Sequence, residues 1–470
     1  MNRKPVLSVI AISFSAVLAA LPCPVARSQD HGPVRADSRP QLVRKIEFGQ
    51  YGSKYARLGD LSGNGQPEVL LVQVVAPEGE NKAIITCLTV VDLEGHVLWQ
   101  VGKPDINNIY FGSDFPVQIY DFDRDGKNEV LYIPDAKNVL TILEGKTGKV
   151  LKKVQLAGGH DSILFADFSG NGYAQELLVK DRYSSFWVYD KNFNLLWSKL
   201  NCNPGHYPME YDLDGDGRDE LLCGYTLYAH DGRVLWSHPF PGHNDAVYID
   251  DMDGDGKAEI AIAASNTRPG EQSILLNAEG KILFRRMADH SQHALIGKFC
   301  PDLPGKQVFF IDRQMHQKGR PIKFSELSLF NRSGEKLLSI KDNIWYLAGE
   351  VIDNWVGSPK ENSLGLYSRG FAPPCLLDGL GRQIAVFPLP EAIKEKGGGP
   401  GGKDLYDDFY MQHLDYLGDN REEIFCYNHK ALYIWTNAAP MEKPVMPNRP
   451  ARPLKQVPRL YNNNFYPGRL

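Results

Sequence analysis

The chain has 470 residues, is 43% hydrophobic and carries a formal net charge of −5 at pH 7. This composition is typical of a folded globular protein, and the absence of a Lys and Arg excess excludes the electrostatic footprint of a nucleic-acid-binding protein. Of the seven cysteines, all but Cys23 are scattered beyond the first 28 residues without a CxxC pair. Neither a zinc knuckle nor a dense disulfide framework is therefore indicated.

The first 28 residues have the pattern of a cleavable export signal. Arg3 and Lys4 form a basic start, an apolar run extends from Val6 to Leu21, and small residues at 26–28 offer a cleavage site. No later stretch approaches the roughly 20 apolar residues of a membrane span. We therefore predict a secreted or periplasmic protein with a cleaved signal peptide and no membrane span.

A strand-like segment, QLVRKIEFG (residues 41–49), precedes a series of six similar acidic loops. In four of them an Asp opens the loop and a Glu closes it at the ninth place, while the copy opened by Asp167 is longer by one residue and the copy opened by Asp415 keeps only the two ends. The four regular loops are Asp60–Glu68, Asp121–Glu129, Asp212–Glu220 and Asp251–Glu259. Repetition at a period of roughly 40 to 60 residues predicts a propeller or a solenoid.

Each acidic loop is followed by a short apolar strand and then by a strand–turn–strand pattern such as TVVDLEGHVLW (89–99). Four antiparallel strands per repeat are typical of a propeller blade. Two further units are degenerate: the one at 297–311 retains the frame without the acids, and the one at 351–368 barely retains it. We therefore predict an all-β protein, an eight-bladed β-propeller with a seven-bladed one as the alternative, whose acidic loops join strands A and B. The recurring tryptophans Trp99, Trp197 and Trp236 are expected in the core between blades.

The last repeat lacks its fourth strand. We expect the strand at 41–49 to complete that blade and close the ring, which leaves no open sheet edge. The propeller then covers residues 41–437, and a tail rich in Pro and Asn follows at 438–470. The glycine-rich segment 394–404 is expected to be an insert between the last two blades, and the protein is expected to be a monomer.

The acidic loops have the composition of calcium sites, because alternating carboxylates on a glycine-containing turn supply the oxygen ligands that this ion prefers. The loops are shorter than an EF-hand loop and lie between strands, so they resemble the calcium loops of FG-GAP/VCBS-repeat (integrin-type) propellers. We predict structural calcium in the loops of units two, four and five. The expected ligands are Asp121, Asp123, Asp125, Glu129, Asp212, Asp214, Asp216, Glu220, Asp251, Asp253, Asp255 and Glu259.

Histidines recur where strand A begins in units three to six, on the face of the ring opposite the acidic loops. They are His160, His206, His243 and His293, and Asp114 takes the matching place in unit two. The connections between strands B and C reach the same face and add Lys180, Arg182, Tyr183, Tyr225 and Arg268. Several polar side chains in register on neighbouring blades predict a convergent pocket.

Histidine, tyrosine and arginine suit the β-elimination of a uronic-acid polysaccharide, which needs a base, an acid and a cation for the carboxylate. Glycoside hydrolysis would require two opposed carboxylates instead. We expect His160, His206, His243, Tyr225 and Arg182 to be catalytic. We expect Lys180, Tyr183, His293, Asp114 and Arg268 to bind the substrate.

Three segments resemble exported FG-GAP propeller proteins of polysaccharide-degrading bacteria, which are akin to lyases acting on rhamnogalacturonan, ulvan and rhamnose–glucuronate linkages. They are GGHDSILFADFSGNGYAQELLVKDRYSSFWVYD, GHYPMEYDLDGDGRDELLCGY and RLYNNNFYPG. The resemblance implies a lyase for an acidic polysaccharide, with His160, His206, Arg182 and Tyr225 matching in kind the His, Tyr and Arg that such lyases use. Two alternatives are a non-catalytic glycan-binding or adhesion propeller and a quinone-dependent dehydrogenase, although the sequence has no adjacent Cys pair of the kind that often accompanies the quinone.

Overall fold

The protein is described by a computed structural model. The described residues are 35–75, 84–107, 109, 115–265, 272–287, 290–313, 325–342, 346–358, 360–368, 373–389, 393–396, 405–406 and 409–440. The expected signal peptide, Asp114, Arg268 and the tail from residue 441 onward lie outside these ranges. No helix of the described chain is long and apolar enough to cross a membrane.

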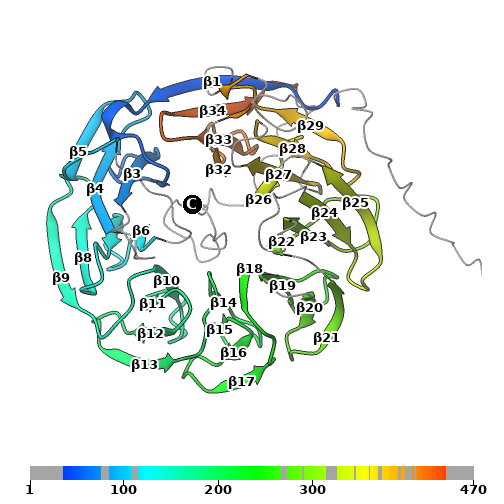
Figure 1. The fold of residues 1–470 in the computed structure, drawn as a ribbon, viewed down its shortest axis with the longest axis horizontal. Helices are drawn as coiled ribbons and strands as arrows, with labels where there is room; N and C mark the ends of the chain where they lie inside the picture. The colour runs from blue at the N-terminus through cyan, green and yellow to red at the C-terminus, as the bar shows by residue number, and fades with distance from the viewer. Residues whose placement is uncertain are drawn as a thin grey trace, which may run out of the picture.

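The described strands form eight four-stranded antiparallel sheets arranged in a ring, together with one two-stranded hairpin (Figure 1). The prediction of an eight-bladed propeller is confirmed, and the seven-bladed alternative is wrong. Strand A of each blade lies toward the centre of the ring and the fourth strand lies at the rim. Apart from the single 3-10 turn η1 (Gly49–Tyr51), the described residues contain only strands and loops.

The first four blades follow the chain order directly. Their strands are β2 (Ala56–Gly59), β3 (Glu68–Val75), β4 (Ile84–Val91) and β5 (Val97–Gly102) in blade 1; β6 (Val117–Tyr120), β7 (Glu129–Tyr132), β8 (Val139–Glu144) and β9 (Val150–Gln155) in blade 2; β10 (Ser162–Ala166), β11 (Glu176–Lys180), β12 (Ser185–Tyr189) and β13 (Leu195–Leu200) in blade 3; and β14 (Met209–Tyr211), β15 (Glu220–Cys223), β16 (Thr226–Tyr228) and β17 (Val234–Ser237) in blade 4.

The remaining blades continue in the same way until the last one. Their strands are β18 (His243–Asp250), β19 (Glu259–Ser265), β20 (Gln272–Asn277) and β21 (Ile282–Met287) in blade 5; β22 (Ser291–Gly297), β23 (Gln307–Arg313), β24 (Ser325–Phe330) and β25 (Lys336–Asp342) in blade 6; β26 (Tyr346–Asp353), β27 (Asn362–Ser368), β28 (Cys375–Leu377) and β29 (Gln383–Val386) in blade 7; β32 (Tyr410–Leu414), β33 (Glu423–Tyr427), β34 (Ala431–Asn437) and β1 (Pro40–Glu47) in blade 8; and the hairpin β30 (Ile393–Glu395) and β31 (Leu405–Tyr406).

Blade 8 takes its outer strand from the beginning of the chain. β1 runs antiparallel to β34, with Pro40 opposite Asn437 and Glu47 opposite Ala431. Arg421 lies behind the end of β34 and donates to the carbonyl oxygen of Asn437 at 2.6 Å. The ring is closed between its first and last strands, so the edge of β34 is paired rather than left open.

The apolar core lies between neighbouring blades. One cluster joins Tyr120 and Leu131 of blade 2 to Phe165 and Leu177 of blade 3. Farther out, a tryptophan on the fourth strand covers a glycine in the next blade, as Trp236 covers Gly280, where an added Cβ would lie 2.7 Å from the indole. The indole N–H of Trp236 donates to the carbonyl oxygen of Ala278 at 2.9 Å. The predicted place of the tryptophans between blades is confirmed.

The six acidic loops share one hydrogen-bonded frame. In each, the closing Glu accepts the backbone N–H of the residue that follows the opening Asp, as Glu220 does from Leu213 at 2.9 Å. The opening Asp accepts N–H groups from the turn, as Asp212 does from Gly215 and Gly217. Blade 6 keeps the frame without the acids, because Gln307 accepts from the N–H of Cys300 at 2.8 Å. The loops between strands A and B are therefore closed by hydrogen bonds from their own backbone N–H groups to the side chains that open and close each loop.

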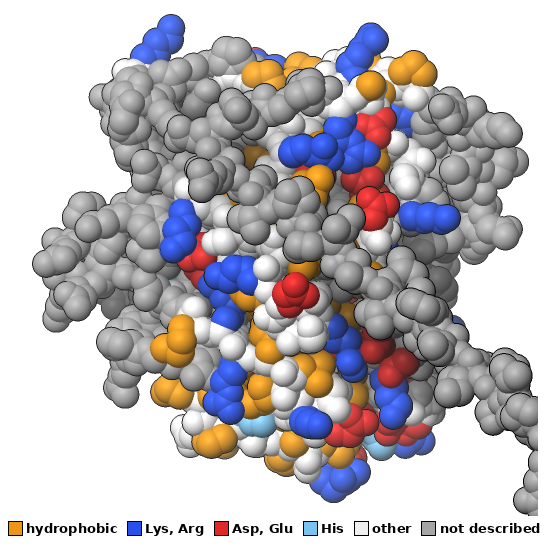
Figure 2. Space-filling view, turned by 90° about the vertical axis from the view of Figure 1, so that its right-hand side faces the viewer, with side chains coloured by type: hydrophobic (Ala, Val, Ile, Leu, Met, Phe, Trp, Pro, Cys, Tyr) orange, Lys and Arg blue, Asp and Glu red, His pale blue; other side chains and the backbone are white. Residues whose placement is uncertain are grey.

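The flank of the ring shown in Figure 2 has Lys and Arg side chains interspersed with Asp and Glu among its described residues. No single-sign patch dominates this view, in keeping with the mild net charge.

Candidate functional site

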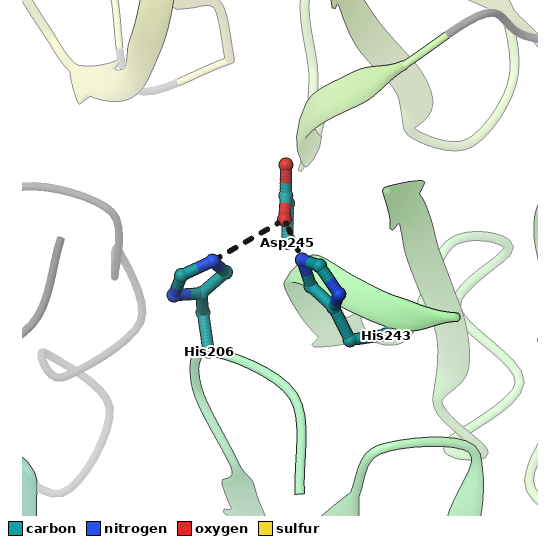
Figure 3. Close-up of side chains that lie close together, drawn as sticks. All are labelled: His206, His243 and Asp245. Carbon is teal, nitrogen blue, oxygen red and sulfur yellow. Dashed lines mark ion pairs between the residues drawn. The ribbon is translucent and has the colours of Figure 1, made fainter. Parts of the chain in front are cut away.

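Histidines from blades 4, 5 and 6 surround one buried carboxylate, Asp245, where strand A begins and thus opposite the acidic loops. Figure 3 shows His206 of blade 4 and His243 of blade 5 pointing toward Asp245. His243 Nε2 lies 3.2 Å and His206 Nε2 lies 3.5 Å from Asp245 Oδ1. His290 Nε2 lies 2.8 Å from Asp245 Oδ2, and the side-chain amide of Gln292 donates to the same oxygen. We call the set His206, His243, Asp245 and His290 the histidine cluster.

A β-bulge directs Asp245 into this cluster. The pairing of β18 with β19 shifts between Asn244 and Ala246, so Asp245 is the extra residue of its strand. The next blade repeats the device, because the pairing of β22 with β23 shifts between Ser291 and His293 and leaves Gln292 as the extra residue. Bulges re-aim side chains next to functional sites. Here two bulges in neighbouring blades point their extra residues at each other.

Asp245 is ionised in this setting. Its burial disfavours the charged form, but the charge of His290 and the hydrogen bonds from His243 and His290 outweigh burial and hold the pKa of Asp245 well below its usual range. A buried carboxylate of this kind balances positive charge on the imidazoles or on a bound cation.

The loop that brings His206 to the cluster depends on a close backbone approach. Gly205 has φ of +72°, and an added Cβ would lie 1.6 Å from Asn244 Oδ1. The backbone N–H of His206 donates to the carbonyl oxygen of Asn244 at 3.1 Å. Because no other residue fits at 205, glycine fixes the position of His206 beside β18.

Two tyrosines contact the histidine cluster in different ways. Tyr183 Oη lies 2.9 Å from His206 Nε2, its ring lies 4.3 Å from the ring of His243, and Tyr183 is 40% exposed. Tyr225 is 8% exposed, and its hydroxyl donates to the carbonyl oxygen of His243 at 3.0 Å. Tyr183 is therefore the phenol that a substrate can reach, and Tyr225 positions the backbone of His243.

A second charged group lies on blade 3, around Asp161. Lys180 Nζ donates to Asp161 Oδ2 at 2.6 Å, and Arg182 Nε lies 3.5 Å from Asp161 Oδ1. His160 Nδ1 lies 3.3 Å from Asp181 Oδ1. Arg182 immediately precedes Tyr183, so the backbone of blade 3 links this charged group to the tyrosine that contacts the histidine cluster.

Two expected substrate-binding residues do not reach the surface. Lys180 and His293 are both 0% exposed, so direct contact of either with a substrate is not compatible with this structure. The ammonium of Lys180 forms an ion pair with Asp161. Burial lowers the pKa of His293 to about 4 against the attraction of Asp245, so this imidazole is neutral at neutral pH. Asp114 and Arg268 lie outside the described residues.

The described residues contain four groups whose side chains could hold a metal ion, each with ligand atoms within 4.8 Å of one another. One is His206, His243 and Asp245, whose mixed nitrogen and oxygen donors suit a divalent transition metal. The others lie in the acidic loops and consist of Asp121, Asp123 and Glu129; Asp212, Asp214 and Glu220; and Asp251, Asp253 and Asp255.

Three of the twelve expected calcium ligands fall outside these groups. Asp125 and Asp216 accept N–H groups from their own loops, and Glu259 pairs with Arg332. Within the groups, burial and the neighbouring carboxylates raise the pKa of Glu129 to about 8 and that of Glu220 to about 7. A bound cation would relieve the repulsion between these neighbouring carboxylates.

Reasoning from the sequence missed Asp245, Asp161, His290 and Gln292. Asp161 directly follows His160, and Asp245 lies two residues after His243, so each acid is adjacent to a predicted histidine. Closeness in sequence to a predicted histidine is therefore the signal by which these two acids could have been found. The bulges that aim Asp245 and Gln292 have no sequence signature of their own.

No protein-family model matches the chain. Two curated relatives from Bacillus subtilis (strain 168) are similar to it. Rhamnogalacturonan exolyase YesX is 24% identical over 418 residues, which cover 72% of this chain and 65% of the relative. Rhamnogalacturonan endolyase YesW is 24% identical over 333 residues, which cover 56% of this chain and 53% of the relative. The alignments thus span less than two thirds of either relative.

Solved structures share the fold. The crystal structure of rhamnogalacturonan lyase YesW aligns with a TM-score of 0.59 at 19% identity, over 89% of this chain and 77% of that one. Exotype rhamnogalacturonan lyase YesX gives 0.56 at 20% identity, over 88% and 75%. The V. cholerae biofilm matrix protein Bap1 gives 0.53 at 14% identity, over 91% of both chains. The chain is therefore an eight-bladed β-propeller with rhamnogalacturonan lyases among its relatives.

Proposed function

We propose that this protein is an exported polysaccharide lyase that cleaves a uronic-acid-containing polysaccharide by β-elimination on the histidine face of the ring. The observation that carries the proposal is the 2.9 Å contact between Tyr183 Oη and His206 Nε2, the nitrogen that also lies 3.5 Å from Asp245 Oδ1. Arg182 directly precedes Tyr183 in the chain. The relatives named as rhamnogalacturonan lyases support the same reaction class and make rhamnogalacturonan the first polymer to test.

In the proposed reaction a base removes the proton next to the uronate carboxylate, a carbon–carbon double bond forms, and the glycosidic oxygen leaves with a proton from an acid. Tyr183 passes its phenolic proton to His206 and, as the phenolate, takes the proton next to the uronate carboxylate. A protonated His243 gives a proton to the leaving oxygen, and transfer of the proton from His206 to His243 restores the starting state. His243, with a side chain that is 26% exposed and a ring 4.3 Å from that of Tyr183, is the second group that we assign to the leaving oxygen. Arg182 can hold the carboxylate through two parallel hydrogen bonds.

Asp245 acts in this scheme through the histidines. Its charge favours the protonated form of an imidazole that has accepted a proton, and its contacts fix the orientation of His206 and His243. Since His206, His243 and Asp245 also have suitable donors, a divalent cation bound there would add positive charge for the uronate carboxylate.

The proposal includes calcium as a structural ion in the loops of blades 2 and 4. The groups Asp121, Asp123, Glu129 and Asp212, Asp214, Glu220 converge and repel one another, which fits a hard cation with oxygen ligands. The ion would stabilise the native loops without taking part in the elimination, because these loops lie on the face away from the histidine cluster.

The test is to incubate the purified protein with rhamnogalacturonan, other uronic-acid polysaccharides and a neutral polysaccharide as control. A lyase produces unsaturated uronate ends, which are measured by ultraviolet absorbance. Tyr183→Phe is the matched variant, because it keeps the ring on His243 and removes only the hydroxyl.

A rise in absorbance with an acidic polymer that is lost in Tyr183→Phe supports the proposal. Polymer binding without any unsaturated product in the whole panel would instead support the non-catalytic alternative, a glycan-binding or adhesion propeller. Repeating the assay after chelation, with calcium alone or calcium together with a divalent transition metal added back, shows whether a metal in the histidine cluster contributes to turnover.

A further inference from the structure

The acidic loop of blade 5 has the same sequence pattern as that of blade 4 but different surroundings. Both loops open with an Asp, carry acids at the third and fifth places and close with a Glu. Both also keep the backbone frame, since Glu259 accepts from the N–H of Met252 at 2.9 Å as Glu220 does from Leu213. The loops themselves therefore give no reason for different ion occupancy.

The difference comes from a neighbouring turn. Arg332 lies in the turn between β24 and β25 of blade 6, and its Nε lies 2.8 Å from Glu259 Oε1 and 3.2 Å from Asp253 Oδ2. Glu259 is 1% exposed, so its charge is paired in a buried position. A guanidinium bridging two carboxylates gives the positive charge that a metal ion would otherwise supply.

A second cation from blade 6 lies beside the same loop. Lys306 Nζ is 2.7 Å from Asp250 Oδ2, in the residue directly before the opening Asp251. The backbone N–H of Lys306 also donates to the carbonyl oxygen of Met252. Blade 6 thus places two basic side chains against the acidic loop of blade 5.

The equivalent turn next to blade 4 has no basic side chain at the matching position. In blade 5 the turn Asn277–Lys281 is closed by the N–H of Gly280 donating to Asn277, and in blade 6 Gly334 donates in the same way to Asn331, at 3.0 Å in both. Both glycines are covered by an aromatic ring of the preceding blade, Trp236 and Phe284 respectively. This correspondence places Ala278 where Arg332 stands. Among the described residues, no ion pair involves Asp212, Asp214 or Glu220.

We infer that Arg332 is an internal substitute for a divalent cation, so that the acidic loop of blade 5 takes up no calcium whereas that of blade 4 does. The inference rests on the proposed structural role of calcium and refines it, since it assigns different ions to two loops of the same sequence pattern.

The test exchanges the two positions. The intact protein and the variants Arg332→Ala and Ala278→Arg are stripped with a chelator and dialysed against calcium chloride, and bound calcium is counted by native mass spectrometry. Arg332→Ala is expected to gain one calcium per chain, and Ala278→Arg is expected to lose one. Arg332→Gln serves as a second variant that keeps more of the side-chain volume.

Single acid substitutions test the same inference without touching the arginine. Asp214→Asn is expected to lower the count by one, and Asp253→Asn is expected to leave it unchanged. Thermal unfolding gives a further readout, because Arg332→Ala should melt lower than the unaltered protein in chelator and regain stability with calcium.

The outcomes separate this inference from the calcium proposal. If Asp214→Asn loses an ion but Arg332→Ala and Arg332→Gln gain none, or if Asp253→Asn also loses one, Arg332 is not a substitute and only this inference is overturned. A count of zero in the unaltered protein and in every variant overturns both.

Discussion

On the acidic-loop face the Asp that opens each loop is held by backbone N–H groups of its own loop, whereas on the histidine face the carboxylate is held by side chains from several blades. Asp212 accepts N–H groups from Gly215 and Gly217, three and five residues away. Asp245 contacts His206 of blade 4 and His290, which is 45 residues farther along the chain. The first kind of contact forms as soon as one loop forms, and the second requires the ring to be assembled. Stabilisation and chemistry can therefore be disturbed separately.

Removing strand β1 is expected to have the largest effect, because both faces depend on a closed ring. A chain lacking residues 41–49 would expose β34, whose edge is now paired from Ala431 to Asn437. Unpaired edges promote aggregation, so we expect loss of the soluble monomer in size-exclusion chromatography. A chain starting at Gly52 that stays monomeric and unfolds cooperatively would show that closure by β1 is dispensable.

The features that could be predicted from the sequence are those set by short-range patterns. The repeat of acidic loops and hairpins predicts the number of blades, because seven blades are built from four strands that are consecutive in the chain and the eighth from three consecutive strands completed by β1. The tryptophans were placed correctly for the same reason. Trp236 and its counterparts occupy one position of the repeat, and each packs on a glycine at another position in the next blade.

The histidine cluster could be predicted only in part, for a physical reason. The register of strand A placed His206 and His243 on one face, and the structure brings them to 5.2 Å between ring centroids. Asp245 was missed because it is the extra residue of a β-bulge, and such a residue has no cross-strand partner from which its direction could be inferred. The burial of Lys180 was not predicted because its ion-pair partner, Asp161, lies 19 residues earlier in the chain, directly before β10.

His206→Ala is expected to have the next largest effect and to act on turnover alone. The substitution removes the imidazole that contacts both Tyr183 and Asp245. We expect turnover to fall by about a hundredfold or more, the usual scale for loss of a general acid–base group, with little change in the melting temperature. Initial rates and thermal unfolding of the same preparation measure both. Unchanged turnover in a folded variant would contradict the proposal that the elimination takes place on the histidine face.

Asp245→Asn should reduce turnover less, by about tenfold to a hundredfold, because the carboxylate acts through the histidines rather than on the substrate. The amide keeps the size of the side chain but loses the charge that faces His243, His206 and His290. We expect kcat to fall and its pH profile to shift, with KM nearly unchanged. A change confined to KM would indicate that Asp245 shapes substrate binding instead.

Asp214→Ala should give the smallest effect, and it should appear in stability rather than in turnover. Asp214 belongs to the acidic group of blade 4, which the backbone frame closes even without an ion. If calcium binds only the native loop, chelation should lower the melting temperature of the unaltered protein by a few degrees, and Asp214→Ala should lose part of that response. Activity per folded molecule should remain, because the loop lies on the face away from Tyr183 and His206. A melting curve that chelation leaves unmoved would contradict a structural role for calcium, and a variant that folds but no longer turns over substrate would mean that the two faces are coupled.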